Sequence, residues 1–134
     1  SHPSRIYVRN TGTYNIQFSF QYVKNNASND TINVWIAKNG TIVPDSDGVI
    51  PLSGAALQNI AAWNYMLKLS AGDYIQFYWQ SSDSAMSLET LAAGTNPTTP
   101  RSPSTIMTAT KIDTVGSGGG LLNVKTIFLI LIGE

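Results

Sequence analysis

The side chains that could carry out acid–base or nucleophilic chemistry are few and scattered. The single histidine, His2, stands near a terminus of the kind that is commonly frayed, so a Ser-His-Asp triad would lack its base. The carboxylates are Asp30, Asp45, Asp47, Asp73, Asp83, Glu89, Asp113 and Glu134. Most of them lie in turn-like sequence, where aspartate caps the backbone, rather than as the facing pair that a glycosidase needs. The sequence therefore predicts no catalytic residue and no enzymatic activity.

Metal and cofactor motifs are incomplete. Asp45-x-Asp47-Gly48 supplies the first two ligands of a calcium loop, but the third acidic position and the terminal glutamate are missing. The glycines at 116 and 118–120 do not lead into a Lys-Ser or Lys-Thr helix start, so they predict a hinge rather than a phosphate loop. No cysteine is present to bind a metal. We expect no metal and no cofactor.

Aromatic side chains could bind a ligand by stacking. The stretch WNYMLKLSAGDYIQFYWQSS, residues 63–82, is dense in tyrosine and tryptophan around one Gly-Asp pair. If exposed, Trp35, Trp63 or Trp79 would stack on the faces of sugars; if buried, they would fill a core. Burial is favoured because most of these aromatics follow the alternation of a strand. Trp35 is the least certain, since it shares its face with a polar and a small residue.

The elements that must position these side chains are strands. The clearest covers residues 14–22, where large apolar residues alternate with polar ones. Its predicted core residues include Tyr14, Ile16, Phe18 and Phe20. Residues 32–36 alternate in the same way and lead into Asn39-Gly40, a pair typical of a tight hairpin turn. With the aromatic stretch and residues 105–112 and 121–132, about seven to nine strands predict an all-β sandwich or barrel.

Two stretches are harder to assign. Residues 53–62, SGAALQNIAA, have the composition of a short helix or of an irregular connection. Residues 82–104 hold three of the six prolines and predict a long surface loop with one helical turn at residues 86–91. Loops of this length in a small domain usually make contacts or carry function.

Composition limits the partners. A chain of 134 residues fits one domain, and its charged content of 12% is low against the roughly 25% of soluble proteins. Net charge is zero and the basic residues are scattered, so no nucleic acid is expected as a partner. The apolar run at residues 127–132 is shorter than the roughly 18 residues of a membrane span. Because the chain opens at Ser1, we expect a processed chain or an excised fragment.

Several short motifs follow one another in a recognisable order. They are the Gly-x-Tyr opening at Gly12 and Tyr14, the turn at Asn39 and Gly40, the Leu-x-x-Gly-Asp-Tyr element from Leu69 to Tyr74, and the pair Pro103 and Ser104. In this order the sequence resembles the jelly-roll domain of the tumour-necrosis-factor and complement globular-head proteins, especially the versions in virion proteins of tailed bacteriophages. The resemblance covers roughly residues 12–112, and TIMTATKI replaces the phenylalanine-rich closing strand of the animal proteins. It implies a homotrimeric jelly roll.

The strand that follows the Gly-Asp pair carries large side chains on both faces. One face, predicted to enter the core, consists of Ile75, Phe77 and Trp79. The opposite face consists of Tyr74, Gln76 and Tyr78. Because a strand of a sandwich needs only one apolar face, the second face is predicted to form the trimer interface around the three-fold axis.

The chain is predicted to divide into a jelly-roll domain, residues 1–112, and a glycine-hinged C-terminal strand or arm, residues 113–134. The apolar side chains expected to act in the arm are Leu121, Leu122, Ile127, Phe128, Leu129 and Ile130. We expect the arm to complete a neighbour's sheet or to fasten the trimer, because so apolar a sheet edge must be covered.

The expected function is that of a non-enzymatic structural protein at the surface of a virion, as a trimeric capsid decoration or as a fibre or tail module of a bacteriophage. Its partners would be the other copies of the homotrimer and other virion proteins. The alternative is a tip domain of a viral fibre that binds a host-surface glycan or receptor. Recognition would then fall to the loops at residues 24–30, 44–48 and 82–104, since loops on a rigid β scaffold commonly bind ligands.

Overall fold

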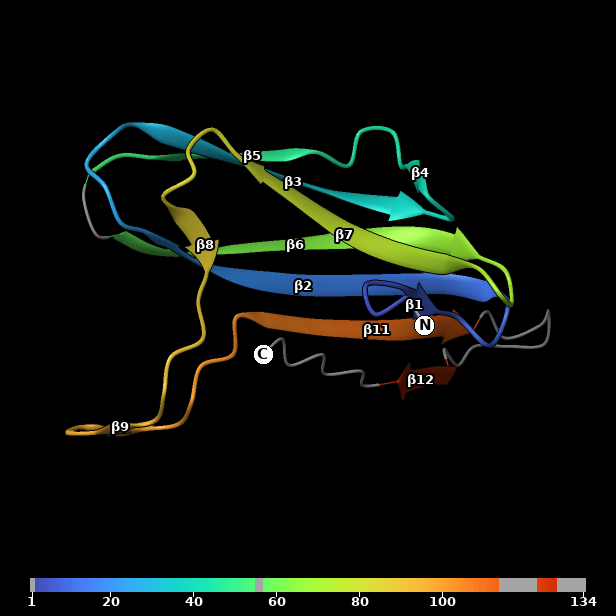
Figure 1. The fold of residues 1–134 in the computed structure, drawn as a ribbon. Coiled ribbons are helices and arrows are strands. Elements are labelled where there is room, and N and C mark those ends of the chain that lie inside the picture. Colours follow the sequence, from blue (N-terminus) through green and yellow to red (C-terminus); the bar gives the residue numbers. More distant parts are fainter. Residues whose placement is uncertain (1, 55–56, 114–122, 128–134) are drawn as a thin grey trace.

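Two antiparallel sheets lie face to face in the computed structural model, which describes residues 2–54, 57–113 and 123–127 (Figure 1). In these residues the regular elements are all strands. Sheet A contains β1 (Ile6–Tyr7), β7 (Tyr74–Ser81) and β3 (Asp30–Lys38) in that order, with β4 (Thr41–Ile42) and β5 (Gly48–Leu52) both paired to β3. The predicted all-β class is confirmed, and the architecture is β-sandwich-like.

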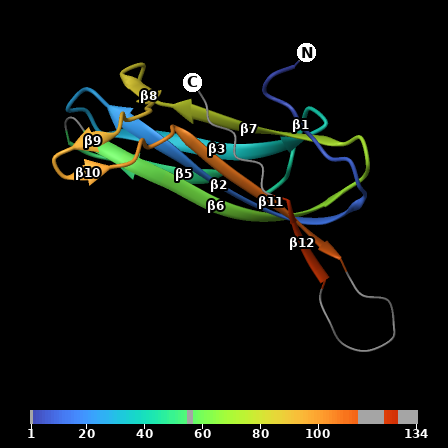
Figure 2. The same cartoon turned by 90° about the horizontal axis from the view of Figure 1, so that it is seen from below.

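Sheet B is built around the longest strands. It contains β12 (Asn123–Ile127), β11 (Thr105–Asp113), β2 (Gly12–Lys24) and β6 (Leu57–Leu69) in that order, and β8 (Met86–Leu88) pairs with the end of β2. Seen from below, the two layers run side by side along the length of the molecule (Figure 2). Both sheets are antiparallel throughout, so consecutive residues on each strand alternate between the core and an outward face.

The core is formed where the inward face of β2 meets sheet A. The buried residues of β2 are Tyr14, Ile16, Phe18, Phe20 and Tyr22. From the other sheet, Ile75 is buried, and Phe77 and Trp79 pack against the same core. The Phe18 and Phe77 ring centroids are 4.4 Å apart, and those of Tyr22 and Trp79 are 5.4 Å apart. Aromatic contacts across the two sheets therefore hold the layers together.

Two stretches differ from the sequence expectation. Residues 57–62, expected as part of a helix or an irregular connection, belong to β6 and pair with β2 in unbroken register. Residues 86–88, expected in a helical turn, form β8 against β2. In both cases pairing to a long neighbouring strand outweighs weak local β preference.

A hairpin stands away from both sheets. β9 (Gly94–Thr95) and β10 (Thr98–Thr99) pair only with each other, and a bridge between Leu91 and Ser102 closes the base of the projection (Figure 1). Most of its residues are exposed. The predicted long loop thus contains β8 and this hairpin.

A lysine and an aspartate form a buried ion pair at one end of the core. Lys24, the last residue of β2, faces inward like the apolar residues before it and has no solvent exposure. Its Nζ lies 3.1 Å from Oδ2 of Asp30 and donates a hydrogen bond to the Gly54 carbonyl oxygen at 3.2 Å. Ser28 Oγ donates to the same carboxylate at 2.7 Å. The Ser28 hydrogen bond, and then Lys24, lower the pKa of Asp30.

Two of the sequence motifs clamp each other at the opposite end. Asn39 Nδ2 donates to Asp73 Oδ1 at 2.7 Å, and the Tyr74 N–H donates to Asn39 Oδ1 at 2.9 Å. Asp73 Oδ2 accepts the Ser70 N–H at 2.7 Å and lies 2.9 Å from Lys38 Nζ. The Asn39 hydrogen bond, and then the Lys38 one, lower the pKa of Asp73 to about 2. The hairpin turn after β3 is thereby fixed to the turn before β7.

Acid is expected to weaken the fold through Asp73. Its pKa is about 2 in the folded chain against an ordinary 3.8, so its stabilising effect is complete above the ordinary value and is lost as the pH falls toward 2. Asp73→Asn should lower Tm at neutral pH and make Tm fall less on acidification. Circular dichroism melts along a pH series measure this, with Asp45→Asn, which changes an exposed carboxylate, as the control. Equal acid sensitivity of Asp73→Asn and the unchanged chain would contradict the clamp.

Candidate functional site

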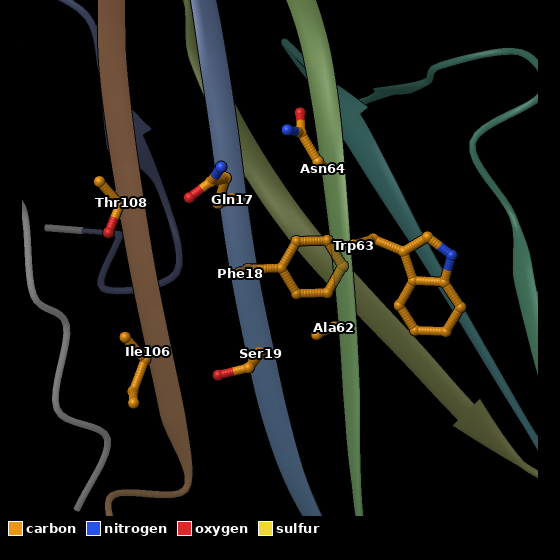
Figure 3. Close-up of a pocket in the computed structure, with 8 residues that line it drawn as sticks. All are labelled: Gln17, Phe18, Ser19, Ala62, Trp63, Asn64, Ile106 and Thr108. Atoms are coloured by element: carbon orange, nitrogen blue, oxygen red, sulfur yellow. The ribbon is translucent and has the colours of Figure 1, made fainter.

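The outward face of sheet B is flat and uncharged over successive cross-strand rows. The rows, given in the order β11, β2, β6, are Thr110–Asn15–Met66, Thr108–Gln17–Asn64 and Ile106–Ser19–Ala62, and Gln21–Ile60 continues them on β2 and β6. Figure 3 shows the middle of this face, where outward-facing residues of the rows and the core residues Phe18 and Trp63 together line a hollow of about 440 Å³. We call the residues of these cross-strand rows the sheet B face.

Apolar side chains are exposed on the sheet B face. Ile60 is 63% exposed, Met66 55% and Ile106 45%. Asn15 Oδ1 and Gln21 Nε2 are shielded from solvent and have no hydrogen-bond partner among the described residues. Large apolar side chains exposed together on one face are typical of a surface that another molecule covers.

The residues predicted to line a trimer axis lie on the outward face of sheet A, and they are Tyr74, Gln76 and Tyr78. The N-terminal segment covers the first two. The Tyr7 ring lies 5.4 Å from that of Tyr74, and the Arg5 guanidinium sits 4.3 Å above the same ring. Gln76 Nε2 donates to Ser4 Oγ at 2.9 Å. This chain therefore supplies its own contacts to Tyr74 and Gln76.

The three tryptophans occupy different environments. Trp79 packs against the core and touches Tyr22. Trp63 also packs against the core, with its ring stacked 6.1 Å from that of Phe18. Trp35 instead lies on the outward face of sheet A, directly opposite Tyr78, and the two rings stack at 5.9 Å with an interplanar angle of 7°. Trp35 is the one tryptophan of the three that lies on an outward face of a sheet.

A groove of about 860 Å³ runs beside Trp35. Its floor is the outward face of β3, one wall is the end of β7, and the other wall is the segment at residues 42–47. The polar side chains in its lining include Asn33, Asp45, Asp47 and Gln80. Of the loops predicted to recognise a ligand, the one at residues 44–48 lines this groove with residues 44–47, the one at residues 82–104 contributes only Ser82, and the one at residues 24–30 does not line it.

Hydrogen bonds to β3 and to sheet B anchor the groove wall at residues 42–47. Ser46 is buried, and its Oγ donates to the Ile36 carbonyl oxygen and accepts the Ile36 N–H, both at 3.3 Å. The Tyr65 hydroxyl, from sheet B, donates to the Ser46 carbonyl oxygen, and burial raises the pKa of this tyrosine. Because Ser46 points inward, Asp45 and Asp47 on either side of it are exposed. Sequence alone showed these aspartates as turn residues and gave no sign of the anchor.

Gly48 is expected to tolerate no side chain without a loss of stability, because Trp63 packs on its backbone. A Cβ at this position would lie 2.2 Å from Trp63 Cζ2, and the ring is held between the sheets. Gly48→Ala should lower the free energy of unfolding by roughly 1–3 kcal/mol through overpacking. Urea unfolding measures the loss, with exposed Val49→Ala as the control. An unchanged urea midpoint for Gly48→Ala would show that Trp63 does not pack there.

Several carboxylates hold loops and turns in place through hydrogen bonds. Asp83 accepts the Ala85 N–H at 2.7 Å, and this bond is the main reason why its pKa is lowered. Asp47 Oδ2 accepts from Asn33 at 2.8 Å. Among the described residues no group of three or more His, Asp or Glu side chains is placed to hold a metal ion. The same part of the chain contains no helix of the length and apolarity that a membrane span needs.

The C-terminal arm is described only in part. Asn123–Ile127 forms β12 and pairs with β11 of the same chain, from Asn123 opposite Asp113 to Ile127 opposite Ala109. The other predicted arm residues lie outside the described residues, and they are Leu121, Leu122, Phe128, Leu129 and Ile130. The described part of the arm therefore extends the sheet of its own chain.

Comparison with known proteins adds no relative. A scan against protein-family models finds no match, and a search of curated proteins finds no similar sequence. The resemblance to the tumour-necrosis-factor-like domains therefore depends on the sequence motifs alone.

Proposed function

We propose that this chain is a non-enzymatic structural protein of a bacteriophage virion, a jelly-roll domain that assembles as a homotrimer on the particle surface. It would serve as a capsid decoration or as a fibre or tail module, in contact with other virion proteins. The resemblance of the sequence motifs supplies the viral setting and the three-fold assembly. The strand order and the sheet B face also support this proposal.

The path of the chain supports the jelly roll. The chain passes from β1 in sheet A to β2 in sheet B, returns to sheet A for β3 and β5, and then alternates through β6, β7 and β11. As a result β7 lies between β1 and β3, and β2 lies between β11 and β6. Such interleaving of strands that are distant in sequence is what two Greek keys folded into two sheets produce.

The observation that carries the assembly is the sheet B face. Its rows hold amide, hydroxyl and apolar side chains without a charge. Charged residues stand at the two ends: Lys68, in the row Ile112–Thr13–Lys68, and Glu89, which pairs beside Gln21 and accepts a hydrogen bond from Gln58. Protein interfaces are depleted in charge at their centres, because a buried unpaired charge is costly. An uncharged face of this kind suits contacts with other copies of the chain.

The face of Tyr74, Gln76 and Tyr78 remains the competing prediction for the trimer interface. Its residues already have intramolecular partners in Tyr7, Ser4 and Trp35. The alternation of the strand alone predicted that another copy must cover this face, and these contacts make such a copy less necessary. We therefore place the proposed interface on the sheet B face.

Sedimentation of the isolated domain tests the assembly. At micromolar concentration the expected mass is three times 14.5 kDa. A mass of 14.5 kDa at all concentrations that remain soluble would overturn the homotrimer. The same measurement with residues 117–134 deleted asks whether the arm is needed to fasten it.

A second function, that of a receptor- or glycan-binding fibre tip, is favoured by the groove beside Trp35. The groove lies on sheet A, on the opposite side of the sandwich from the sheet B face. Assembly through one sheet and recognition through the other are therefore compatible.

A further inference from the structure

The groove beside Trp35 combines a flat aromatic surface with hydrogen-bonding groups. Trp35 on β3 and Tyr78 on β7 form a stacked pair, and the neighbours of Trp35 on β3, Val34 and Ile36, are buried in the core. Tyr78 is 40% exposed, so the pair is accessible from solvent. Aromatic rings of this kind offer an apolar face to ligands whose edges are polar.

The polar lining of the groove favours a ligand that donates hydrogen bonds. Asp45 and Asp47 are exposed carboxylates, which only accept hydrogen bonds when ionised. Asn33 and Gln80 add amides that both donate and accept. No lysine or arginine lines the groove. Anionic ligands such as phosphates, sulfated sugars or sialic acids would therefore meet repulsion without a compensating cation.

The two aspartates are held in place before any ligand arrives. The inward hydrogen bonds of Ser46 fix the segment between them, and Asn33 holds the Asp47 carboxylate at 2.8 Å. Asp45 has a left-handed backbone with φ of 58°, which sets the direction of its side chain. A rigid wall lowers the entropy cost of binding a small polar ligand.

We propose that this groove binds a neutral saccharide, with a pyranose ring packed against Trp35 and with its hydroxyl groups donating to Asp45 and Asp47. This inference deepens the recognition role named above, on which it rests, and does not depend on the homotrimer. A sugar ring matches the site because one face is apolar and its edge carries several hydroxyl donors.

The test is a titration of the full chain with the methyl glycosides of glucose, galactose and N-acetylglucosamine, followed by two-dimensional amide NMR. At least one glycoside should shift the amide signals of Asn33, Trp35 and residues 45–47, with a Kd on the order of 1 mM, a weak affinity of about 4 kcal/mol. Trp35→Ala should weaken binding at least about tenfold. Asp45→Asn should weaken it several-fold.

Tyr7→Ala is the matched control. It truncates an exposed aromatic residue on the same sheet but outside the groove, so saccharide affinity should not change. Circular dichroism of each variant checks that the fold is kept. A multivalent array that includes neutral, sialylated and sulfated glycans extends the search beyond the three probes.

Three outcomes would overturn the proposal. The first is the absence of any signal shift together with a blank array, and the second is binding that Trp35→Ala and Tyr7→Ala weaken equally. The third is binding of anionic glycans alone. Because the mass of the assembly is measured separately, a monomer that binds sugar refutes only the homotrimer, and a trimer that binds none refutes only the saccharide site.

Discussion

The double variant Met66→Lys/Ile106→Lys is expected to reduce the particle from three times 14.5 kDa to a single chain of 14.5 kDa. Both side chains are exposed on the sheet B face, at 55% and 45%, so a free chain tolerates the lysines. In a homotrimer joined through this face, the lysines of several copies would be brought together in an uncharged interface. Like charges that are desolvated in this way cost several kcal/mol, on the order of the whole assembly energy.

Sedimentation velocity at micromolar concentration measures the effect, and the matched control is Tyr74→Lys/Tyr78→Lys on the outward face of sheet A. The control should keep the mass of the unchanged protein. If the control dissociates and the first variant does not, the interface lies on sheet A, where the parity of the strand placed it. If neither dissociates, both faces are free of copy contacts and the assembly uses another surface.

Phe18→Ala is expected to lower the free energy of unfolding by roughly 3–5 kcal/mol, because it empties the centre of the core. Phe18 is 4% exposed, and its ring contacts Phe20, Trp63, Tyr65 and Phe77. Domains of this size have a total stability of about 5–15 kcal/mol, so the variant should be barely folded at 37 °C.

Urea unfolding followed by tryptophan fluorescence measures this loss, because Trp63 lies beside the emptied site. Phe18→Leu should cost much less, since it refills most of the volume. Ile60→Ala, which truncates a side chain that is 63% exposed, should change stability by about 0.5 kcal/mol or less. A Phe18→Ala variant as stable as Ile60→Ala would mean that the two sheets do not meet at this residue.

Local alternation was sufficient to predict the inward face of β2 but not its full length. The pattern at residues 14–22 is strong because each inward residue is large and apolar. Lys24 continues the same parity and is fully buried, yet a lysine before an Asn-rich segment is typical of a loop. Its partner Asp30 lies beyond that segment, so the pairing exists only once β2 and β3 have folded back on each other.

The strands at residues 57–62 and 86–88 were missed for a related reason. Their small and polar residues have little intrinsic β preference, and both become strands by pairing with β2. A pattern read along one segment carries no information about the segment that lies beside it. The mutual clamp of Asn39 and Asp73 was hidden in the same way, although each residue was recognised in its own turn.

The sequence predicted individual parts of the candidate site but not that they lie together. Trp35 stood out because it shares its strand face with a polar and a small residue, and the segment at residues 44–48 stood out as a turn. What joins them is the anchoring of Ser46 to β3 and to Tyr65, a contact between residues far apart in sequence. Those bonds turn an ordinary turn into the wall of a groove.

The projecting β9–β10 hairpin is a position at which the chain could be cleaved into two fragments. A protease that cut the exposed hairpin would leave one fragment carrying β1 to β9 and another carrying β10 to β12. β11 would remain hydrogen-bonded to β2, from Thr105 opposite Phe20 to Ile112 opposite Thr13, and Met107 would remain buried in the core. The two fragments should therefore remain associated after cleavage. When they are produced separately, they should associate with each other, as the fragments of a split reporter protein do.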